Sequence, residues 1–111
     1  MPAVKLSLLP VAQVKPGVER RLAHTDHLMI ATMDFTNGPQ REPDPFHAHP
    51  HEQVSAVVEG ELFFVTESEK TRLGPGDMFI VPGGQPHAIQ LLTKRVRLID
   101  CFTPIREDFL T

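Results

Sequence analysis

The sequence predicts an all-β protein, an antiparallel β-barrel or jelly roll, and three observations support this fold class. Apolar residues alternate with a period of two in short runs, and no helical spacing of apolar residues is sustained. Turn residues separate these runs, and the 111 residues include 7 Gly and 11 Pro. Short strands at such spacing close most economically into a barrel or jelly roll, because closure removes unpaired strand edges.

The six clearest of the expected strands are apolar runs bounded by turn residues. They cover residues 28–35, 54–58, 62–65, 78–81, 87–92 and 96–102. Residues 4–9, between Pro2 and Pro10, are expected to form an edge strand lent to a partner subunit, or else a surface strand of the same chain. Alternation along the strands places ten side chains in a core between two packed sheets: Met29, Ala31, Met33, Phe35, Phe63, Val65, Ile80, Ile89, Val96 and Leu98.

The composition argues against several classes of protein. Hydrophobic residues make up 41% and charged residues 23%, and no apolar run approaches the ~20 residues of a membrane span. The net charge is −3, and no basic cluster is longer than Lys94, Arg95 and Arg97, so neither nucleic acid nor membrane is an expected partner. Cys101 is the single cysteine and the N-terminus lacks the features of a signal peptide, so we expect a cytoplasmic protein without an intrachain disulfide.

Three of the six histidines lie within residues 47–51 and suggest a metal site. Side chains two apart on a strand share a face, so His47 and His49 can present two imidazoles to one ion. Gln53 begins the next strand after a turn and is the candidate third ligand, and His87 follows a Pro-Gly-Gly-Gln-Pro turn as the fourth. An isolated His-x-His pair is more often a surface feature, so the assignment depends on these two further ligands.

The other residues considered as metal ligands are weaker candidates. Glu52 would supply a carboxylate ligand, but it lies on the opposite strand face from Gln53. His51 follows a proline turn and is expected at the cavity mouth or on the surface. His24 and His27 flank a Thr-Asp turn and are expected in solvent.

The last expected strand carries a carboxylate among apolar residues. Asp100 shares one face with Leu98 and Phe102, and a buried ionisable group is costly unless it has a partner. Asp100 is therefore either a functional residue or a cap at the end of the strand. Arg106, after a Thr-Pro break, is near enough in sequence to fold back over the cavity as an anion clamp, although a solvated arginine is the commoner outcome.

Taken together, these residues resemble the two sequence motifs of the cupin family. The first motif ends in His-x-His, three residues, Glu or Gln, six residues and Gly, which match His47, His49, Gln53 and Gly60. The second motif is Gly, five residues, Pro-x-Gly, two residues and His, which match Gly76, Pro82, Gly84 and His87. The resemblance implies a double-stranded β-helix of the RmlC-like type. We expect one domain, residues 1–111, with N-terminal edge strands and a dimer contact in 1–26, both motifs in 41–91, and the closing strand and tail in 95–111.

Three departures from the family pattern are visible. Arg41 stands where the first motif usually has Gly, Leu91 stands where the second usually has Asn, and neither position is a ligand. Gln53 stands where most cupins have a carboxylate. A neutral ligand set leaves the full dipositive charge on the metal, which makes it a harder Lewis acid and a weaker electron donor. A dioxygenase is therefore the least expected activity.

Residues 47–53 and 100–109 resemble a narrower group, the pectin-degradation cupins of the KdgF type. The resemblance rests on the His, His, Gln, His ligands and on an Asp-x-Phe-x-Pro-x-Arg tail that contains Asp100, Phe102 and Arg106. It implies a metal-dependent enzyme of the lyase or isomerase type that converts a 4,5-unsaturated galacturonate-type ring into its linear keto form. Relatives often have Tyr where this chain has Ala56. A non-catalytic cupin that binds a small molecule or a metal is the alternative function.

The expected cofactor is one divalent transition metal. Nickel, zinc, manganese and iron all suit mixed imidazole and oxygen ligands. The expected partners are an anionic sugar acid as substrate and a second copy of the chain, in a homodimer built on the N-terminal strand.

Overall fold

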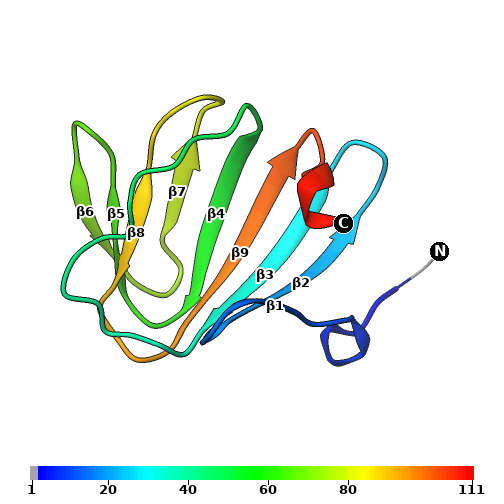
Figure 1. Cartoon of the computed structure of the whole chain (residues 1–111), viewed down its shortest axis with the longest axis horizontal. Coiled ribbons are helices and arrows are strands. Elements are labelled where there is room, and N and C mark those ends of the chain that lie inside the picture. Colours follow the sequence, from blue (N-terminus) through cyan, green and yellow to red (C-terminus); the bar gives the residue numbers. More distant parts are fainter. Residues whose placement is uncertain (1–2) are drawn as a thin grey trace.

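The computed structural model describes residues 3–111, and these residues form nine β-strands and two short 3-10 helices (Figure 1). The strands are β1 (Ala12–Lys15), β2 (Val18–His24), β3 (Met29–Phe35), β4 (Glu52–Glu59), β5 (Leu62–Val65), β6 (Lys70–Leu73), β7 (Met78–Val81), β8 (Ala88–Leu91) and β9 (Val96–Thr103). The helices are η1 (Leu6–Leu8) and η2 (Glu107–Phe109). The all-β class is therefore as predicted.

The strands form two antiparallel sheets that pack face to face. The larger sheet has the order β1-β2-β3-β9-β4-β7, and the smaller has the order β6-β5-β8. Phe64 of β5 and Phe79 of β7 stack across the space between them, with ring centroids 4.5 Å apart. These two rings belong to the main hydrophobic core, which side chains of both sheets build. A second cluster covers the inner face near β3 and includes Met29, Ala31 and Phe102.

Of the two predicted forms, a barrel or a jelly roll, the structure agrees with the jelly roll. Within residues 3–111 no strand of one sheet pairs with a strand of the other, so the arrangement is an open two-sheet jelly roll. The edge strands β1 and β6 consist mainly of exposed residues, several of them charged or polar, and such edges resist further pairing. One isolated bridge, His47 with His87, connects the long β3–β4 connection to the residue that precedes β8.

The strand predictions succeed where apolar residues alternate and fail where they do not. Strands β5 and β7 have the predicted limits, and β3, β4, β8 and β9 agree within a few residues. The expected strand at residues 4–9 is wrong, because this segment contains η1 and pairs with no strand. Edge strands were expected within residues 1–26, but the limits of β1 and β2 were not predicted, and β6 was not predicted at all, since these sequences are rich in charged and polar residues.

The predicted core is partly correct. Met29, Ala31, Val96 and Leu98 are buried, and Met33, Phe35 and Ile89 pack against the core from partly buried positions. Three assignments have the wrong face, namely Phe63, Val65 and Ile80. In β5 the buried residues are Leu62 and Phe64, and in β7 they are Phe79 and Val81, while Ile80 is 67% exposed. All four residues of each of these strands are apolar, so alternation alone cannot decide which face is buried.

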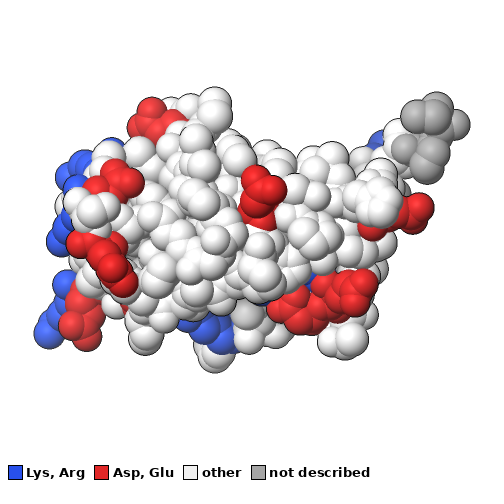
Figure 2. Space-filling view, turned by 90° about the horizontal axis from the view of Figure 1, so that it is seen from above, with Lys and Arg blue, Asp and Glu red and all other residues white. Residues whose placement is uncertain are grey.

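Charged side chains are unevenly distributed over the surface. Viewed from above, Lys, Arg, Asp and Glu gather together at the end that carries β5 and β6, while much of the middle of this face is uncharged (Figure 2). The face shown has no extended basic patch of the kind that binds nucleic acid. No helix among residues 3–111 is long and apolar enough to cross a membrane.

Candidate functional site

Two loops bring three histidines together at one end of the sheets. His47 and His49 precede β4, and His87 precedes β8. The backbone N–H of His47 donates to the carbonyl of His87 at 3.0 Å, and the N–H of His87 donates back to the carbonyl of His47 at 3.0 Å. One ring nitrogen from each of His47, His49 and His87 lies within 4.8 Å of the other two. Three imidazoles at this spacing can bind one metal ion.

The turn at residues 82–86 packs directly on the loop that carries His49. The N–H of Gly84 donates to the carbonyl of His49 at 2.7 Å, and Gly84 has a φ of +83°, which glycine adopts at little cost. At Gly83 a Cβ atom would lie 2.5 Å from the carbonyl oxygen of Pro50. The two glycines therefore let the turn approach the His49 loop closely, and this approach places His87 beside His49.

The ring orientation of two histidines suits metal binding. Nδ1 of His49 lies 3.0 Å from the carbonyl oxygen of His51, and Nδ1 of His87 lies 2.9 Å from that of Gln85. Because a carbonyl oxygen only accepts, both Nδ1 atoms carry the proton, and in the neutral ring Nε2 then has a free lone pair. Partial desolvation lowers the pKa of His47, which is still exposed, and burial lowers that of His87; both shifts favour the neutral form that ligates metals.

The side-chain amide oxygen of Gln53 points toward the ring of His49. Its Oε1 lies 3.0 Å from Nε2 of His49, and its Nε2 donates to Oγ of Ser55 at 2.9 Å. With neutral His49, two lone pairs point at each other, an arrangement that needs a cation or a proton between them. A metal ion meets this need, since imidazole nitrogen and amide oxygen are both metal ligands. The predicted set of His47, His49, Gln53 and His87 therefore fits a metal in this structure.

The weaker candidates lie outside this cluster. Glu52 is exposed on the outer face of β4, as its alternation predicts. His51 is partly buried, and the positive charge of Arg106 is one of the causes that lower its pKa, after burial. His24 and His27 are exposed, in agreement with the prediction.

Asp100 is buried and forms a hydrogen bond with Ser55. The two residues lie opposite each other in β9 and β4, and Oγ of Ser55 donates to Oδ1 of Asp100 at 2.6 Å. Asp100 is 8% exposed and Ser55 is 2% exposed. Burial raises the pKa of Asp100 to about 6, although the Ser55 hydrogen bond and the Arg106 charge act in the opposite direction. A continuous chain of contacts thus links His49, Gln53, Ser55 and Asp100.

The C-terminal tail folds over this site. The ring of Phe102 contacts His49 at a centroid distance of 5.8 Å and Phe109 at 5.6 Å. Arg106 does reach the cavity, but its Nε and Nη2 atoms donate to the carboxylate of Asp108, at 3.1 and 2.9 Å. Arg106 therefore lies at the cavity, and an anion that binds there would share it with Asp108, a carboxylate of the same tail.

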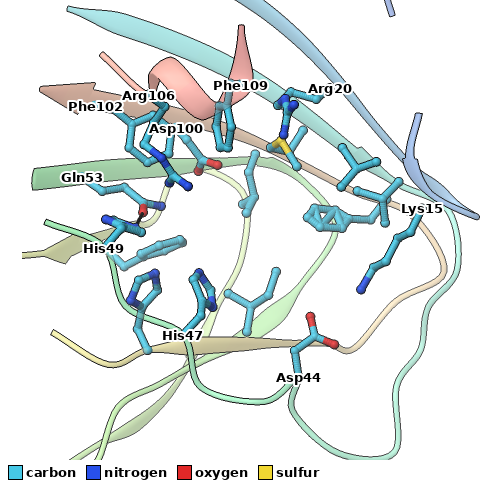
Figure 3. Close-up of a pocket in the computed structure, with 18 residues that line it drawn as sticks. Lys15, Arg20, Asp44, His47, His49, Gln53, Asp100, Phe102, Arg106 and Phe109 are labelled. Atoms are coloured by element: carbon cyan, nitrogen blue, oxygen red, sulfur yellow. Dashed lines mark hydrogen bonds between the residues drawn. The ribbon is translucent and has the colours of Figure 1, made fainter. Parts of the chain in front are cut away.

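A cavity of about 300 Å³ joins these groups (Figure 3). Its size is at the small end of the range for small-molecule sites, about 300–1,000 Å³, and suits one sugar ring. In Figure 3, His47, His49 and Gln53 lie on one side, Asp100, Phe102 and Arg106 lie above, and Lys15 lies on the far side.

Sequence reasoning missed four residues that matter here: Lys15, Arg20, Ser55 and Phe109. Alternation along β2 places Arg20 on the inner face, but the strand itself was not recognised because its sequence is rich in charged residues.

Comparisons with known proteins agree with this geometry. Residues 33–102 match a family described as "Cupin domain". The "Pectin degradation protein KdgF" of Dickeya dadantii (strain 3937) is 32% identical over 103 residues, which cover 91% of each protein. The solved structure of KdgF from Halomonas sp. is 35% identical, with a TM-score of 0.80, and the match covers 90% of this chain and 92% of that one. An RmlC-like cupin from Shewanella frigidimarina NCIMB 400 is 35% identical, with a TM-score of 0.82 and coverage of 93% and 90%.

Proposed function

The chain belongs to the cupin family, and on this premise we propose that it is a metal-dependent enzyme acting on an unsaturated sugar acid. The proposed reaction converts a 4,5-unsaturated uronate of the galacturonate type into its linear keto form. One observation carries the proposal: a buried carboxylic acid, Asp100, lines the same cavity of about 300 Å³ as a cluster of three histidines. The similarity to KdgF, a pectin degradation protein by name, supports the choice of substrate.

The proposed metal ligands are His47, His49, Gln53 and His87. Nickel, zinc, manganese or iron suits this set of imidazoles and one amide oxygen. A divalent metal bound there supplies a Lewis acid that polarises a substrate oxygen.

Asp100 is the proposed proton-transfer group. Opening of the hemiacetal breaks the bond between C1 and the ring oxygen and leaves an enol at C4 and C5. Delivery of a proton to C4 and loss of the enol O–H proton then give the ketone, so the overall reaction is an isomerisation. With a pKa raised to about 6, Asp100 is suited to both giving and taking a proton near neutral pH. Ser55 holds Oδ1, which leaves Oδ2 to act on the sugar.

Phe102 and Arg106 are proposed to hold the sugar and not to transfer protons. Phe102 is 3% exposed and packs against both His49 and Phe109, so it closes one wall of the cavity. Arg106 stacks on Phe109, with its Cζ atom 4.2 Å from the ring centroid, and adds positive charge near Asp100. Loss of Arg106 is therefore expected to act on substrate binding more than on turnover.

The test is a panel of unsaturated uronates incubated with metal-loaded protein. Loss of the absorbance of the conjugated double bond and a linear keto product in the NMR spectrum are expected with the galacturonate-type substrate. The double variant His47→Ala, His49→Ala is expected to lose both the metal and the activity. If every member of the panel stays intact while the protein holds one metal per chain, the enzyme proposal fails and a binding module is left. Oxygen consumption during turnover would instead indicate a dioxygenase.

We also propose a cytoplasmic homodimer. The outer face of the larger sheet exposes an apolar row, because Ile30 pairs with Cys101, Cys101 with Val54, and Val54 with Ile80 in the strand register. Ile30, Val54 and Ile80 are 44%, 47% and 67% exposed. Apolar surfaces of this kind mark interfaces, and a second copy of the same face is the partner we propose. The N-terminal edge strand β1 borders the same sheet.

A further inference from the structure

Arg20 lies in the cavity on the side away from the histidines. It belongs to β2, where Val18 and Arg20 both line the cavity, so its side chain points inward. Figure 3 shows its guanidinium group beside Phe109, across the cavity from His47 and His49. The next residue, Arg21, does not line the cavity and forms an ion pair with Asp34.

Arg20 forms no direct ion pair among residues 3–111, although the charge of Asp108 acts on it. Arg21 and Arg97 pair with Asp34, Arg72 pairs with Glu61, and Arg106 pairs with Asp108. The side chain of Arg20 makes no ion pair or hydrogen bond within the described chain, and its Nε atom is buried without a partner. Burial and the nearby charge of Arg106 lower the pKa of Arg20, and the charge of Asp108 offsets this only in part, so the positive charge is poorly solvated. A charge in such a position is stabilised when an anion binds beside it.

Phe109 holds the guanidinium plane of Arg20 in place. The Cζ atom of Arg20 lies 3.8 Å from the centroid of the Phe109 ring, and that of Arg106 lies 4.2 Å from the same centroid. Two guanidinium groups therefore share one aromatic ring. The two Nη atoms of Arg20 make no hydrogen bond and, unlike Nε, are not fully buried, so they are available for bidentate contact with a carboxylate.

The charges that line the cavity favour an anionic ligand. Lys15, Arg20 and Arg106 contribute positive charge, whereas Asp44 and Asp100 are the carboxylates on the lining. Arg106 is already paired with Asp108. Arg20 is therefore the cavity arginine whose charge is left for a ligand.

We infer that Arg20 binds the carboxylate of the ligand and is a specificity-determining residue for sugar acids. The inference deepens the proposed function and rests on it for the sugar part of the ligand. A carboxylate held by Arg20 turns the ring and hydroxyl oxygens of the sugar toward the histidines and Asp100. Neutral sugars of the same shape lack this contact and are expected to bind more weakly.

The experiment measures the binding of D-galacturonate and of neutral D-galactose to the metal-loaded full chain by calorimetry or NMR titration. Wild type is expected to prefer the acid. Arg20→Gln is expected to weaken galacturonate binding about tenfold to a hundredfold, the usual effect of losing a charge-assisted contact, while galactose binding stays within about twofold. Arg20→Lys is expected to keep part of the preference. The matched control Arg21→Gln removes a charge from the adjacent residue and is expected to leave both sugars unaffected.

Three results would overturn the inference: wild type without a preference for the acid, unchanged galacturonate binding by Arg20→Gln, or equal weakening of both sugars by Arg20→Gln. The last result would show that Arg20 only packs on Phe109. Turnover separates this inference from the proposed function. If wild type turns the uronate over and Arg20→Gln has the same KM, the role of Arg20 is refuted and the proposed function stands. If the preference for the acid depends on Arg20 but no uronate is turned over, the enzyme proposal is refuted and the role of Arg20 stands.

Discussion

The carboxyl group of Asp100 is buried at a cost to stability, and this cost depends on pH. Because the folded-state pKa of about 6 lies above the unfolded value of 3.8, the folded state binds its proton more tightly. Unfolding therefore releases a proton between these pH values, and the contribution of Asp100 to the free energy of unfolding falls as pH rises from about 4 to about 6. Above pH 6 the full penalty, about 3 kcal/mol, is present.

Asp100→Asn removes this titration. The variant is expected to be more stable than wild type by up to about 3 kcal/mol at pH 7.5 and by much less at ~pH 4.5. Urea unfolding of metal-free protein at both pH values measures the difference, and histidine titration cancels in the comparison. Asp26→Asn, at an exposed turn, serves as the control and is expected to change little at either pH. Equal stability of wild type and Asp100→Asn at pH 7.5 would show that Asp100 is not destabilising.

Ser55 determines the orientation of two functional groups at once. Its hydroxyl accepts from Gln53 and donates to Asp100, so Ser55→Ala leaves both groups without this partner. We expect a loss of about 1–3 kcal/mol in unfolding free energy and a metal affinity about 10- to 100-fold lower. Calorimetric titration with zinc or nickel measures the affinity. Ser68→Ala, at an exposed position, is the control, and wild-type affinity in Ser55→Ala would refute the positioning role.

At the scale of single elements, the turn at residues 82–86 determines where His87 lies. A Cβ at Gly83 would meet the carbonyl oxygen of Pro50 at 2.5 Å, so Gly83→Ala must push the turn away from the His49 loop. We expect lower stability and weaker metal binding. Gly74→Ala is the matched control, because its Cβ would have only an ordinary contact, 3.8 Å from Glu61. Metal titration of both variants decides the point, and a Gly83→Ala protein with wild-type affinity would contradict it.

The strands and turns also show which features of the molecule can be predicted from the sequence. The local spacing of residues was sufficient to predict the histidine cluster, because His-x-His and the Pro-Gly-Gly-Gln-Pro turn each place their ligands by short-range geometry. Alternation was sufficient for Asp100, since β9 has a clear buried face. It failed for Phe63 and Ile80, where both faces of the strand are apolar. It also failed for Arg20, whose strand became recognisable only through its pairing with β3.

At the scale of the whole molecule, the proposed dimer is testable by mass. Light scattering is expected to give twice the chain mass of 12.4 kDa. Ile80→Lys puts a charge into the apolar outer face and is expected to shift the protein toward the monomer. Leu8→Lys, at a 78% exposed residue of η1, is the control and is expected to leave the mass unchanged. A wild-type monomer at micromolar concentration would refute the homodimer.

The metal site and Asp100 are proposed to act together on a sugar acid in one cavity. The most direct measurement compares turnover of a 4,5-unsaturated galacturonate by wild type and by Asp100→Asn at equal metal content. We expect one metal per chain in both proteins and a kcat about 10²- to 10⁴-fold lower in the variant, the usual contribution of general acid–base catalysis. Full activity of Asp100→Asn would contradict this expectation and remove Asp100 from the mechanism.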